Sequence, residues 1–530
     1  MALKKICIAV ALACASQAYA APTTGPSTTT TPYLTAVATG LDYTSILTTG
    51  DSVGGYLMGG IPDGLGAYDN NDGTFTLLMN HEIGTATVAG VPNTPLGTVR
   101  AHGAAGAYVS KWVINKTTLA VTSGQDLMTS VKNANGSAYT GSLAFSRFCS
   151  ADLPAATAFY NPVSGLGTQT RLFMNGEESS AGSPVPFGSI GSRALAHTAD
   201  GSNAGTSYVL SAFGAASWEN LAANAKVQDK TVVVGQSDGN ANVGGTNVNG
   251  AVAVYVGTKQ ATGTDAEKAG LNNGTTYYVN VAGVTAERTN TAAGASPSTI
   301  ANGTAFSLTT NAATAFSRPE DGAWISDNEY VFVTTDRIDT TELTGGTQVG
   351  RSRLYKMTFA DISDPTLGGT IDTLLDGTEG QIMLDNLSFN SDGTLSLLED
   401  TGNAAHNGKV WKYNLATDTL TLDAKSDVTR FGDVVGGVFQ NPGTTFLTQD
   451  EETSGIIDVS SMYNDGKLHQ LIVMQNHAAA TGVNATTLVE GGQLLMQTSV
   501  AAVPEADTYS MMLTGLGLMG FVARRRNSKK

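Results

Sequence analysis

Short strand-like runs, in which apolar and polar residues alternate or apolar residues cluster, recur along the chain and are separated by Asp, Asn and Gly. Clear pairs of such runs span residues 66–79, 324–334 and 387–398. Asp-Gly or Asp-Asn stands between the two runs of each pair and supplies the positive backbone angles that a tight turn requires. Each pair therefore predicts a β-hairpin.

The number and spread of these hairpins predict an all-β fold. A β-propeller is favoured, because radial repetition of small sheets protects their strand edges. The repeat is not sharp in sequence, so a large β-sandwich or paired domains are alternatives. Residues 153–170, rich in Pro, Gly and Ala, predict a loop insertion. Residues 258–310, rich in Asn, Thr, Ala and Gly, predict a surface insertion or a small subdomain.

The N-terminal residues have the features of an export signal and a leader. Residues 1–20 combine two lysines, an apolar run and Ala18-Tyr19-Ala20, which is the layout of a secretory signal peptide. Residues 21–40 contain Pro-Thr-Thr-Gly-Pro-Ser and a threonine run, and they predict a flexible leader. No clear linker divides residues 41–500, so these are expected to form one domain.

The C-terminal residues 503–526 hold Val503-Pro504-Glu505-Ala506, an apolar stretch and three arginines. The apolar stretch is about 13 residues long, short against the roughly 20 that an ordinary membrane-spanning helix needs. This order resembles the PEP-CTERM sorting signal of Gram-negative bacteria, which an exosortase recognises. The resemblance implies export to the periplasm, the outer surface or the extracellular matrix, with transient membrane anchoring by the C-terminal helix.

Composition supports strands and turns and indicates a cation-binding surface. The chain has 62 Gly among 530 residues, only 14% charged residues, and a net charge of −16. An acidic surface disfavours nucleic acid and anionic membranes, and it suits bound cations, especially Ca²⁺ with its preference for oxygen ligands. Acidity that only keeps an exported protein soluble is the simpler explanation.

Cys149 is the only cysteine outside the predicted signal peptide, so it has no disulfide partner within the mature chain. It is either a small buried core residue or a thiolate held by a metal. Carboxylates near the ends of strand-like runs are the other candidate ligands, and each alone is also a common turn or cap residue. These acids suit Ca²⁺, and a thiolate among them suits Fe³⁺; they are Glu178, Glu219, Asp238, Glu320, Asp385 and Asp400.

Common hydrolytic motifs are missing from the sequence. There is no Gly-x-Ser-x-Gly elbow and no Walker loop. His81-Glu82 lacks a second histidine at Thr85, so a His-Glu-x-x-His zinc site is excluded, and a lone histidine after an apolar strand is more often structural. The acidic run Gln449-Asp450-Glu451-Glu452 is expected to be a solvated face.

Several short motifs, in matching order, resemble the PhoX family of alkaline phosphatases. They are Asn80-His81-Glu82, Cys149 followed by Gly176-Glu177-Glu178, Trp218-Glu219-Asn220, Arg318-Pro319-Glu320, and Leu384 to Phe389 with Asp392-Gly393. The resemblance implies a six-bladed β-propeller whose central funnel holds a mixed Fe³⁺ and Ca²⁺ cluster that hydrolyses phosphomonoesters. It also implies roles for single residues: Cys149 as the iron thiolate, Arg318 as the phosphate clamp beside Glu320, and Glu178, Glu219, Asp238, Glu320 and either Asp385 or Asp400 as iron or calcium ligands.

The chain also departs from that family. Ser150-Ala151-Asp152 follows Cys149 where the family has Ala-Gly-Gly, and Gly176 stands where the family has a cysteine, so an altered metal site is expected. Arg318 and Glu320 could also form a structural ion pair, worth little if exposed. Two other functions are considered: a calcium-stabilised propeller that binds extracellular matrix or exopolysaccharide, and a phytase-like or lactone-hydrolysing propeller that uses Ca²⁺ alone.

Overall fold

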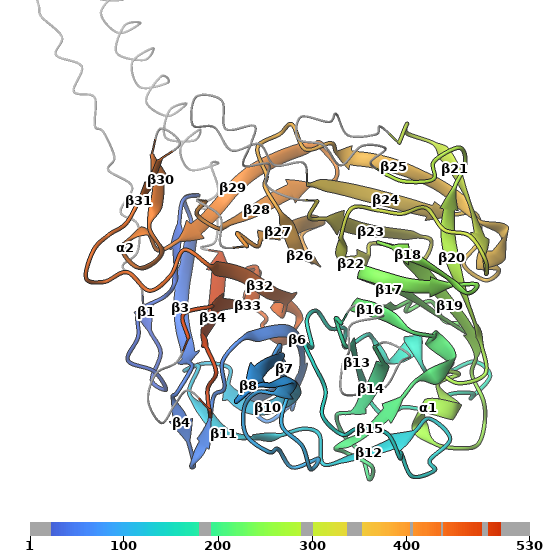
Figure 1. The fold of residues 1–530 in the computed structure, drawn as a ribbon, viewed down its shortest axis with the longest axis horizontal. Coiled ribbons are helices and arrows are strands. Elements are labelled where there is room, and N and C mark those ends of the chain that lie inside the picture. The colour runs from blue at the N-terminus through green and yellow to red at the C-terminus, as the bar shows by residue number, and fades with distance from the viewer. Residues whose placement is uncertain are drawn as a thin grey trace, which may run out of the picture.

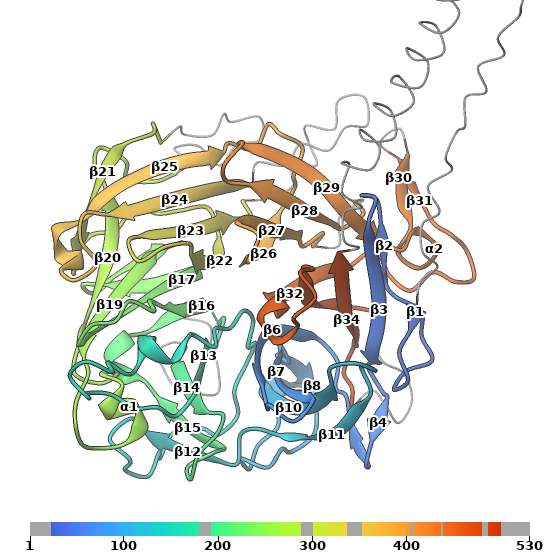
Figure 2. The ribbon, with the colours of Figure 1, turned by 180° about the vertical axis from the view of Figure 1, so that it is seen from behind.

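The computed structural model describes residues 23–179, 192–287, 300–336, 352–402, 406–435, 438–479 and 486–499. Within these residues, sheets of mainly antiparallel strands are arranged around a central axis, as the front and back views show (Figures 1 and 2). The fold is an all-β propeller, as the hairpin pattern predicts. The predicted signal peptide and the C-terminal sorting signal lie outside the described residues.

The described strands form six blades, each of which is given from its inner to its outer strand. Blade 1 consists of β6 (Pro62–Asp69), β7 (Thr74–His81), β10 (Tyr108–Asn115) and β11 (Val121–Asp126). Blade 2 consists of β13 (Leu172–Gly176), β14 (Ala194–Thr198), β15 (Thr206–Val209) and β12 (Ser130–Asn133). Blade 3 consists of β16 (Ala216–Ala223), β17 (Lys230–Val243), β19 (Val252–Thr258) and β20 (Thr275–Val281). Blade 4 consists of β22 (Pro319–Trp324), β23 (Glu329–Thr334), β24 (Arg353–Phe359) and β25 (Gly369–Leu375). Blade 5 consists of β26 (Leu384–Phe389), β27 (Thr394–Glu399), β28 (Lys409–Asn414) and β29 (Thr419–Ser426). Blade 6 consists of β32 (Glu451–Asp458), β33 (His469–Asn476), β34 (Gly491–Ser499) and β3 (Leu41–Thr48).

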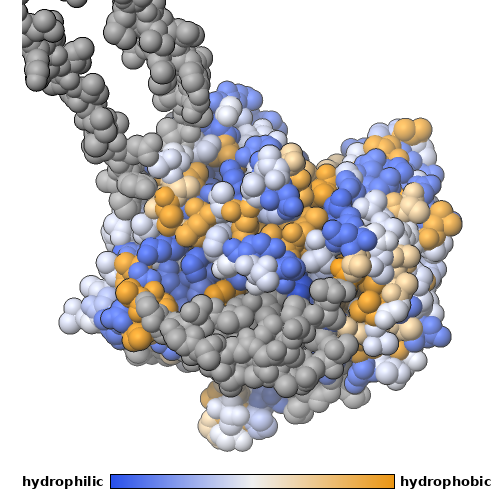
Figure 3. Space-filling model, turned by 90° about the horizontal axis from the view of Figure 1, so that it is seen from above, coloured by the Kyte–Doolittle hydropathy of each residue, from blue (hydrophilic) through white to orange (hydrophobic). Residues whose placement is uncertain are grey.

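The three predicted hairpins are inner hairpins of these blades. Residues 66–79 lie in β6–β7, residues 324–334 in β22–β23, and residues 387–398 in β26–β27. Burial rises toward the axis: all eight residues of β16 are buried, whereas exposed residues alternate along the outer strand β29. On the face shown in Figure 3, hydrophilic and hydrophobic residues are interspersed over the described surface.

Two stretches differ from the sequence-based expectation. Within residues 21–40, expected to be a free leader, β1 (Thr23–Thr24) pairs with β3 and β2 (Leu34–Ala36) pairs with β29. Backbone pairing along a sheet edge needs no hydrophobic sequence, so composition did not reveal it. Residues 258–310, expected to be an insertion, contain β20 and β21 (Thr304–Thr309), and β21 joins blades 3 and 4 by pairing with both β20 and β25.

Strands from both ends of the chain close the ring in blade 6. β3 pairs antiparallel with β34, and Leu47 lies opposite Leu494, both with no exposed surface. We expect Leu47→Ala to lower the free energy of unfolding by about 2–5 kcal/mol, because it leaves a cavity where the two ends meet. Urea denaturation measures this loss, and Val163→Ala at an 86% exposed position serves as the control. An equal effect of both substitutions would contradict the closure argument.

No helix among the described residues is long and apolar enough to cross a membrane.

Candidate metal centre

One thiol and five carboxylates, one from each blade, form a ring at the same end of the central channel. The acids stand at or near the beginning of the inner strands β6, β16, β22, β26 and β32, and they are Asp63, Glu219, Glu320, Asp385 and Glu452. In blade 2 the equivalent place belongs to Cys149, in residues 148–152, which bridge to Met174 in β13 and to Glu177 directly after it. Cys149 thus occupies the position that a carboxylate holds in the other blades.

β-Bulges hold most of these ring residues. The pairing of β6, β16, β22 and β26 with their second strands shifts at the acid itself: Asp63, Glu219, Glu320 and Asp385 each lie inside the irregularity. A bulge inserts an extra residue into one strand and re-aims its side chain. In β32 the bulge follows Glu452, between Thr453 and Ile456.

A left-handed backbone residue stands two positions before four of the ring residues. Ile61, Arg147, Arg318 and Met383 have φ of 49°, 53°, 56° and 49°, and they precede Asp63, Cys149, Glu320 and Asp385. Such a conformation costs a residue with a side chain of order 1–3 kcal/mol and persists only where the surrounding structure imposes it. The same left-handed backbone turn, two residues before the ring residue, therefore recurs in blades 1, 2, 4 and 5.

The Cys149 segment is fixed against blade 1. Gly64 donates its backbone N–H to the Cys149 carbonyl over 3.0 Å, and Asn80 Nδ2 donates to the same oxygen over 2.7 Å. A Cβ on Gly64 would stand 2.5 Å from the Ala151 nitrogen, so glycine is required for this close approach. Asn175 donates to Asn80 over 2.9 Å and contacts His197 Nε2 at 2.8 Å, which extends the network into blade 2.

The residues after Cys149, where the sequence departs from the PhoX pattern, also contact the ring. The Ser150 hydroxyl donates to Glu219 Oε1 over 2.8 Å and accepts from Asn386 Nδ2 over 2.6 Å. Asp152 accepts the Ala223 backbone N–H over 2.8 Å, which ties the segment to β16. Cys149 itself is only 4% exposed, and its Sγ lies 3.1 Å from Glu178 Oε2.

A second set of acids completes the pocket. Asp238 lies in β17, and Glu82, Glu178 and Asp400 directly follow or nearly follow the ends of β7, β13 and β27. The free volume among all these groups is about 30 Å³, room for only a few water-sized spheres. The space suits ions rather than a large organic molecule.

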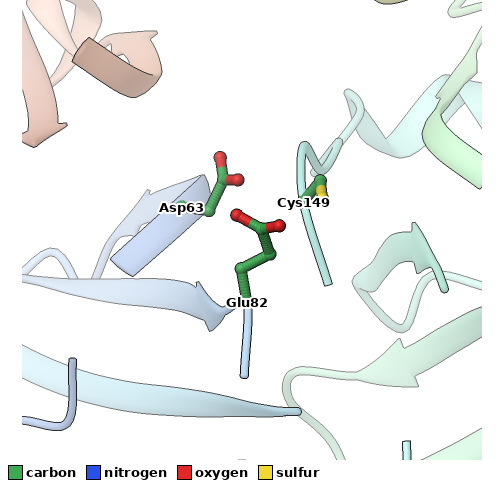
Figure 4. A group of neighbouring side chains, drawn as sticks. All are labelled: Asp63, Glu82 and Cys149. Atoms are coloured by element: carbon green, nitrogen blue, oxygen red, sulfur yellow. The ribbon is translucent and has the colours of Figure 1, made fainter. Parts of the chain in front are cut away.

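Three groups of side chains bring potential ligand atoms within 4.8 Å of one another. Asp63, Glu82 and Cys149 form one group, and Figure 4 shows their side chains converging from three different segments. The other two groups share Glu219: one is Cys149, Glu178 and Glu219, and the other is Glu219, Glu320 and Asp385. The groups are connected through shared members, so the pocket can hold several cations side by side.

Two arginines supply the positive charge among the side chains that line this pocket. Arg147 Nε lies 2.9 Å from Glu82 Oε1, and its Nη2 lies 2.5 Å from Glu178 Oε2. Arg318 pairs with Asp238 through Nε at 2.9 Å and with Glu320 through Nη2 at 3.2 Å. Nine carboxyl groups and a thiol thus face two guanidinium groups in a largely buried space.

This excess of acid strongly disfavours ionisation when no cation is bound. Burial raises the pKa of Glu219 to about 8 and that of Asp400 to about 7. Burial, reinforced by neighbouring carboxylates, raises the pKa values of Asp63, Glu178, Glu320 and Asp385 well above their usual range. The pKa of the Cys149 thiol is also raised well above its usual value, first by burial and then by Glu219 and Glu82.

Glu452 has an acid–base environment of its own. Burial acts against its ionisation, but the hydrogen bond and charge of His477 outweigh burial and lower the pKa of Glu452. His477 lies 3.6 Å from Glu452 Oε2 and 2.6 Å from Glu490 Oε2. Hydrogen bonds to these two acids overcome burial and raise the pKa of His477 to about 11.

The structure brings every sequence-predicted site residue to this pocket: Cys149, Glu178, Glu219, Asp238, Arg318, Glu320, Asp385 and Asp400. It adds four residues that were not predicted as ligands: Asp63, Glu82, Arg147 and Glu452. Glu452, expected on a solvated face, is 7% exposed because β32 is an inner strand. Pro62-Asp63-Gly64 parallels Pro319-Glu320-Asp321, and this internal similarity was the available signal for Asp63.

A larger cavity of about 360 Å³ lies further along the same inner strands. Its lining includes Leu65, Trp324, Phe389 and Ile456, and its polar side chains include Asp152 and Asp321. Burial raises the pKa of both of these carboxyls to about 7. The convergent acids of the ring lie outside this cavity, so size alone does not locate the chemistry.

Comparison with known proteins confirms the C-terminal prediction. A family model described as the PEP-CTERM protein-sorting motif matches residues 502–526. The chain therefore carries a PEP-CTERM sorting motif. This motif marks the protein for export and exosortase processing. A search of curated protein sequences found no match.

Solved structures with similarity to this chain include three enzymes. Pseudomonas fluorescens PhoX in complex with vanadate, a transition state analogue, aligns at 12% identity with a TM-score of 0.49, covering 87% of this chain and 95% of that chain. Inactive virginiamycin B lyase from Staphylococcus aureus with quinupristin aligns at 10% identity and a TM-score of 0.29, covering 82% and 94%. A PL25 ulvan lyase aligns at 12% identity and a TM-score of 0.31, covering 81% and 79%.

Proposed function

We propose that this protein is an exported, metal-dependent phosphomonoesterase that releases phosphate at a mixed Fe³⁺ and Ca²⁺ centre. The observation that carries the proposal is the six-residue ring, in which one thiol and five carboxylates from six blades meet beside two arginines. The motif order that resembles PhoX points to the same activity. The sorting motif supports export.

The donor set fits bound cations. Asp63 Oδ1 is buried and has no hydrogen-bond partner among the described residues. The raised pKa values of Asp63 and Glu219 indicate that the negative charge of these carboxylates is not balanced by nearby cations. Buried carboxylates need cationic partners, and hard oxygen donors suit Ca²⁺. A thiolate is a softer ligand, so Cys149 suits a transition metal. Cys149, Glu178 and Glu219 would hold iron, and Asp63, Glu82, Glu320, Asp385, Asp400 and Asp238 would supply oxygen ligands for calcium.

When bound, these cations supply Lewis acidity and stabilise the charge on the transferred phosphoryl group. The protein's own contribution is to bind and orient that group. Arg318 is held by Asp238 and Glu320, so its guanidinium is fixed in place before a phosphate arrives. A fixed guanidinium donates charge-assisted hydrogen bonds to phosphate oxygens with little loss of side-chain freedom.

Metal content and hydrolysis measured on one purified sample test the proposal. We expect iron together with calcium by mass spectrometry, and hydrolysis of a chromogenic phosphomonoester that is lost after chelation and restored by adding both metals. Calcium without iron, and no hydrolysis of any phosphate ester, would contradict the proposal. That result would instead favour a calcium-stabilised propeller that binds exopolysaccharide.

A further inference from the structure

We propose that Arg147 is a second anion-binding residue, which acts with Arg318 to select doubly charged phosphomonoesters; this inference rests on the proposed function. The two arginines have equivalent positions in blades 2 and 4. Each has a left-handed backbone, with φ of 53° and 56°, and each stands two residues before a ring residue, Cys149 or Glu320. Both line the pocket that contains the ring.

The two guanidinium groups are held in the same way. Arg147 is anchored by Glu82 and Glu178, and Arg318 by Asp238 and Glu320. Among the described residues, Nη1 of neither arginine has a hydrogen-bond or ion-pair partner. The two side chains are 48% and 41% exposed, so an incoming anion can reach both.

The backbone corner does not explain why arginine stands there. At the equivalent corners of blades 1 and 5 the residues are Ile61 and Met383, with φ of 49° at each. Arginine is therefore not needed to form the turn. These arginines balance the charge of the buried acids, and their unused N–H donors can in addition bind an anion.

A pair of anchored guanidinium groups discriminates between phosphate esters by charge and by the number of terminal oxygens. A phosphomonoester carries up to two negative charges on three terminal oxygens, whereas a diester carries one charge on two. Because carboxylates hold Nε and Nη2, each guanidinium offers its Nη1 group as a charged donor to such oxygens. Two guanidiniums are thus matched to the monoester, and the diester can satisfy only one of them fully.

Arg147→Gly, Arg318→Gly and the control Arg171→Gly test this inference. Glycine accepts the positive φ of Arg147 and Arg318, so these substitutions remove the side chain without straining the turn. Arg171 is a matched arginine outside the pocket: it is 44% exposed and pairs with Asp200. For each variant, calorimetry gives the Kd of inorganic phosphate, mass spectrometry gives the metal content, and kinetics give kcat and KM for a monoester and a diester.

For Arg147→Gly we expect the Kd of phosphate and the KM of the monoester to rise roughly 10- to 100-fold, the loss typical of a charge-assisted hydrogen bond. The KM of the diester is expected to change less than threefold, and Arg171→Gly to behave as wild type. Phosphate affinity and monoester KM within twofold of the Arg171→Gly values would overturn the inference.

If Arg147→Gly loses its metal, Arg147→Lys becomes the deciding variant, because lysine keeps the positive charge but lacks the planar guanidinium. With metal retained, a weaker phosphate affinity in Arg147→Lys supports anion binding, and an unchanged affinity overturns it. Failure of the proposed function is recognised separately, because the wild type itself would then hydrolyse no phosphomonoester.

Discussion

On the proposed function, Cys149→Ser is expected to bind no iron and to lose nearly all phosphomonoesterase activity. Serine keeps the shape of a side chain that is only 4% exposed, so the fold is retained, but it replaces the thiol next to Glu178 by a hydroxyl. Loss of a Lewis-acidic ion removes several kcal/mol of charge stabilisation, which corresponds to about a thousandfold decrease in kcat. Glu320→Gln is expected to have a similar effect, because it removes both a proposed ligand and an anchor of Arg318.

Metal analysis and kinetics on the same samples measure these losses. Glu329→Gln is the matched control, since Glu329 lies on the neighbouring strand β23 and pairs with Lys356 away from the pocket. The control should keep wild-type metal content and kcat. Full activity and full iron content in Cys149→Ser would rule out the thiolate as an iron ligand and leave Cys149 as a buried core residue.

Chelation is expected to reverse the pH dependence of stability. In the metal-free protein, Glu219 and Asp400 have pKa values of about 8 and about 7, above their values in an unfolded chain. Between roughly pH 4.5 and pH 8 the folded state therefore holds protons that the unfolded state has released. Stability is highest below this window and falls as pH rises through it, by up to about 1.4 kcal/mol per pH unit for each group.

Excess calcium should produce the opposite trend. Cations compete with protons for the same carboxylates, so metal affinity increases with pH. At a concentration 100 times its Kd, one bound cation adds about 2.7 kcal/mol to the stability of the folded state. Thermal unfolding from pH 5 to pH 8, with chelator or with Ca²⁺, measures both slopes.

Substitution of the titrating groups identifies the source of the slope. Glu219→Gln and Asp400→Asn should each flatten the decline seen with chelator, whereas Glu329→Gln should leave it unchanged. Identical pH profiles with chelator and with Ca²⁺ would show that the pocket binds no calcium.

Local features of this protein could be predicted from sequence because neighbouring residues determine them. Asp-Gly and Asp-Asn turns located the hairpins β6–β7, β22–β23 and β26–β27, and the motif at residues 502–526 was recognisable from its resemblance to a known sorting signal. Cys149 was a candidate ligand because it is a lone cysteine, and several acids were candidates because they lie near the ends of strand-like runs. Their grouping was inferred from the family resemblance, not from periodicity.

The remaining features depend on contacts between distant parts of the chain. Blade 6 closes only because β3 and β34, from opposite ends of the described chain, pair with each other. Asp63 and Glu452 look like ordinary turn or surface acids in sequence, and they become pocket residues because blades 1 and 6 meet at the axis.

The sequence by itself therefore determined the β-hairpins, the sorting motif and most of the candidate ligands, since each depends on local chemistry. Only the tertiary structure decided that Cys149 takes the place of a carboxylate in a ring with one member from each blade, and that Arg147 matches Arg318. The physical reason is that radial closure and bulge geometry set these positions, and both arise from pairing between strands rather than from the order of residues within one strand.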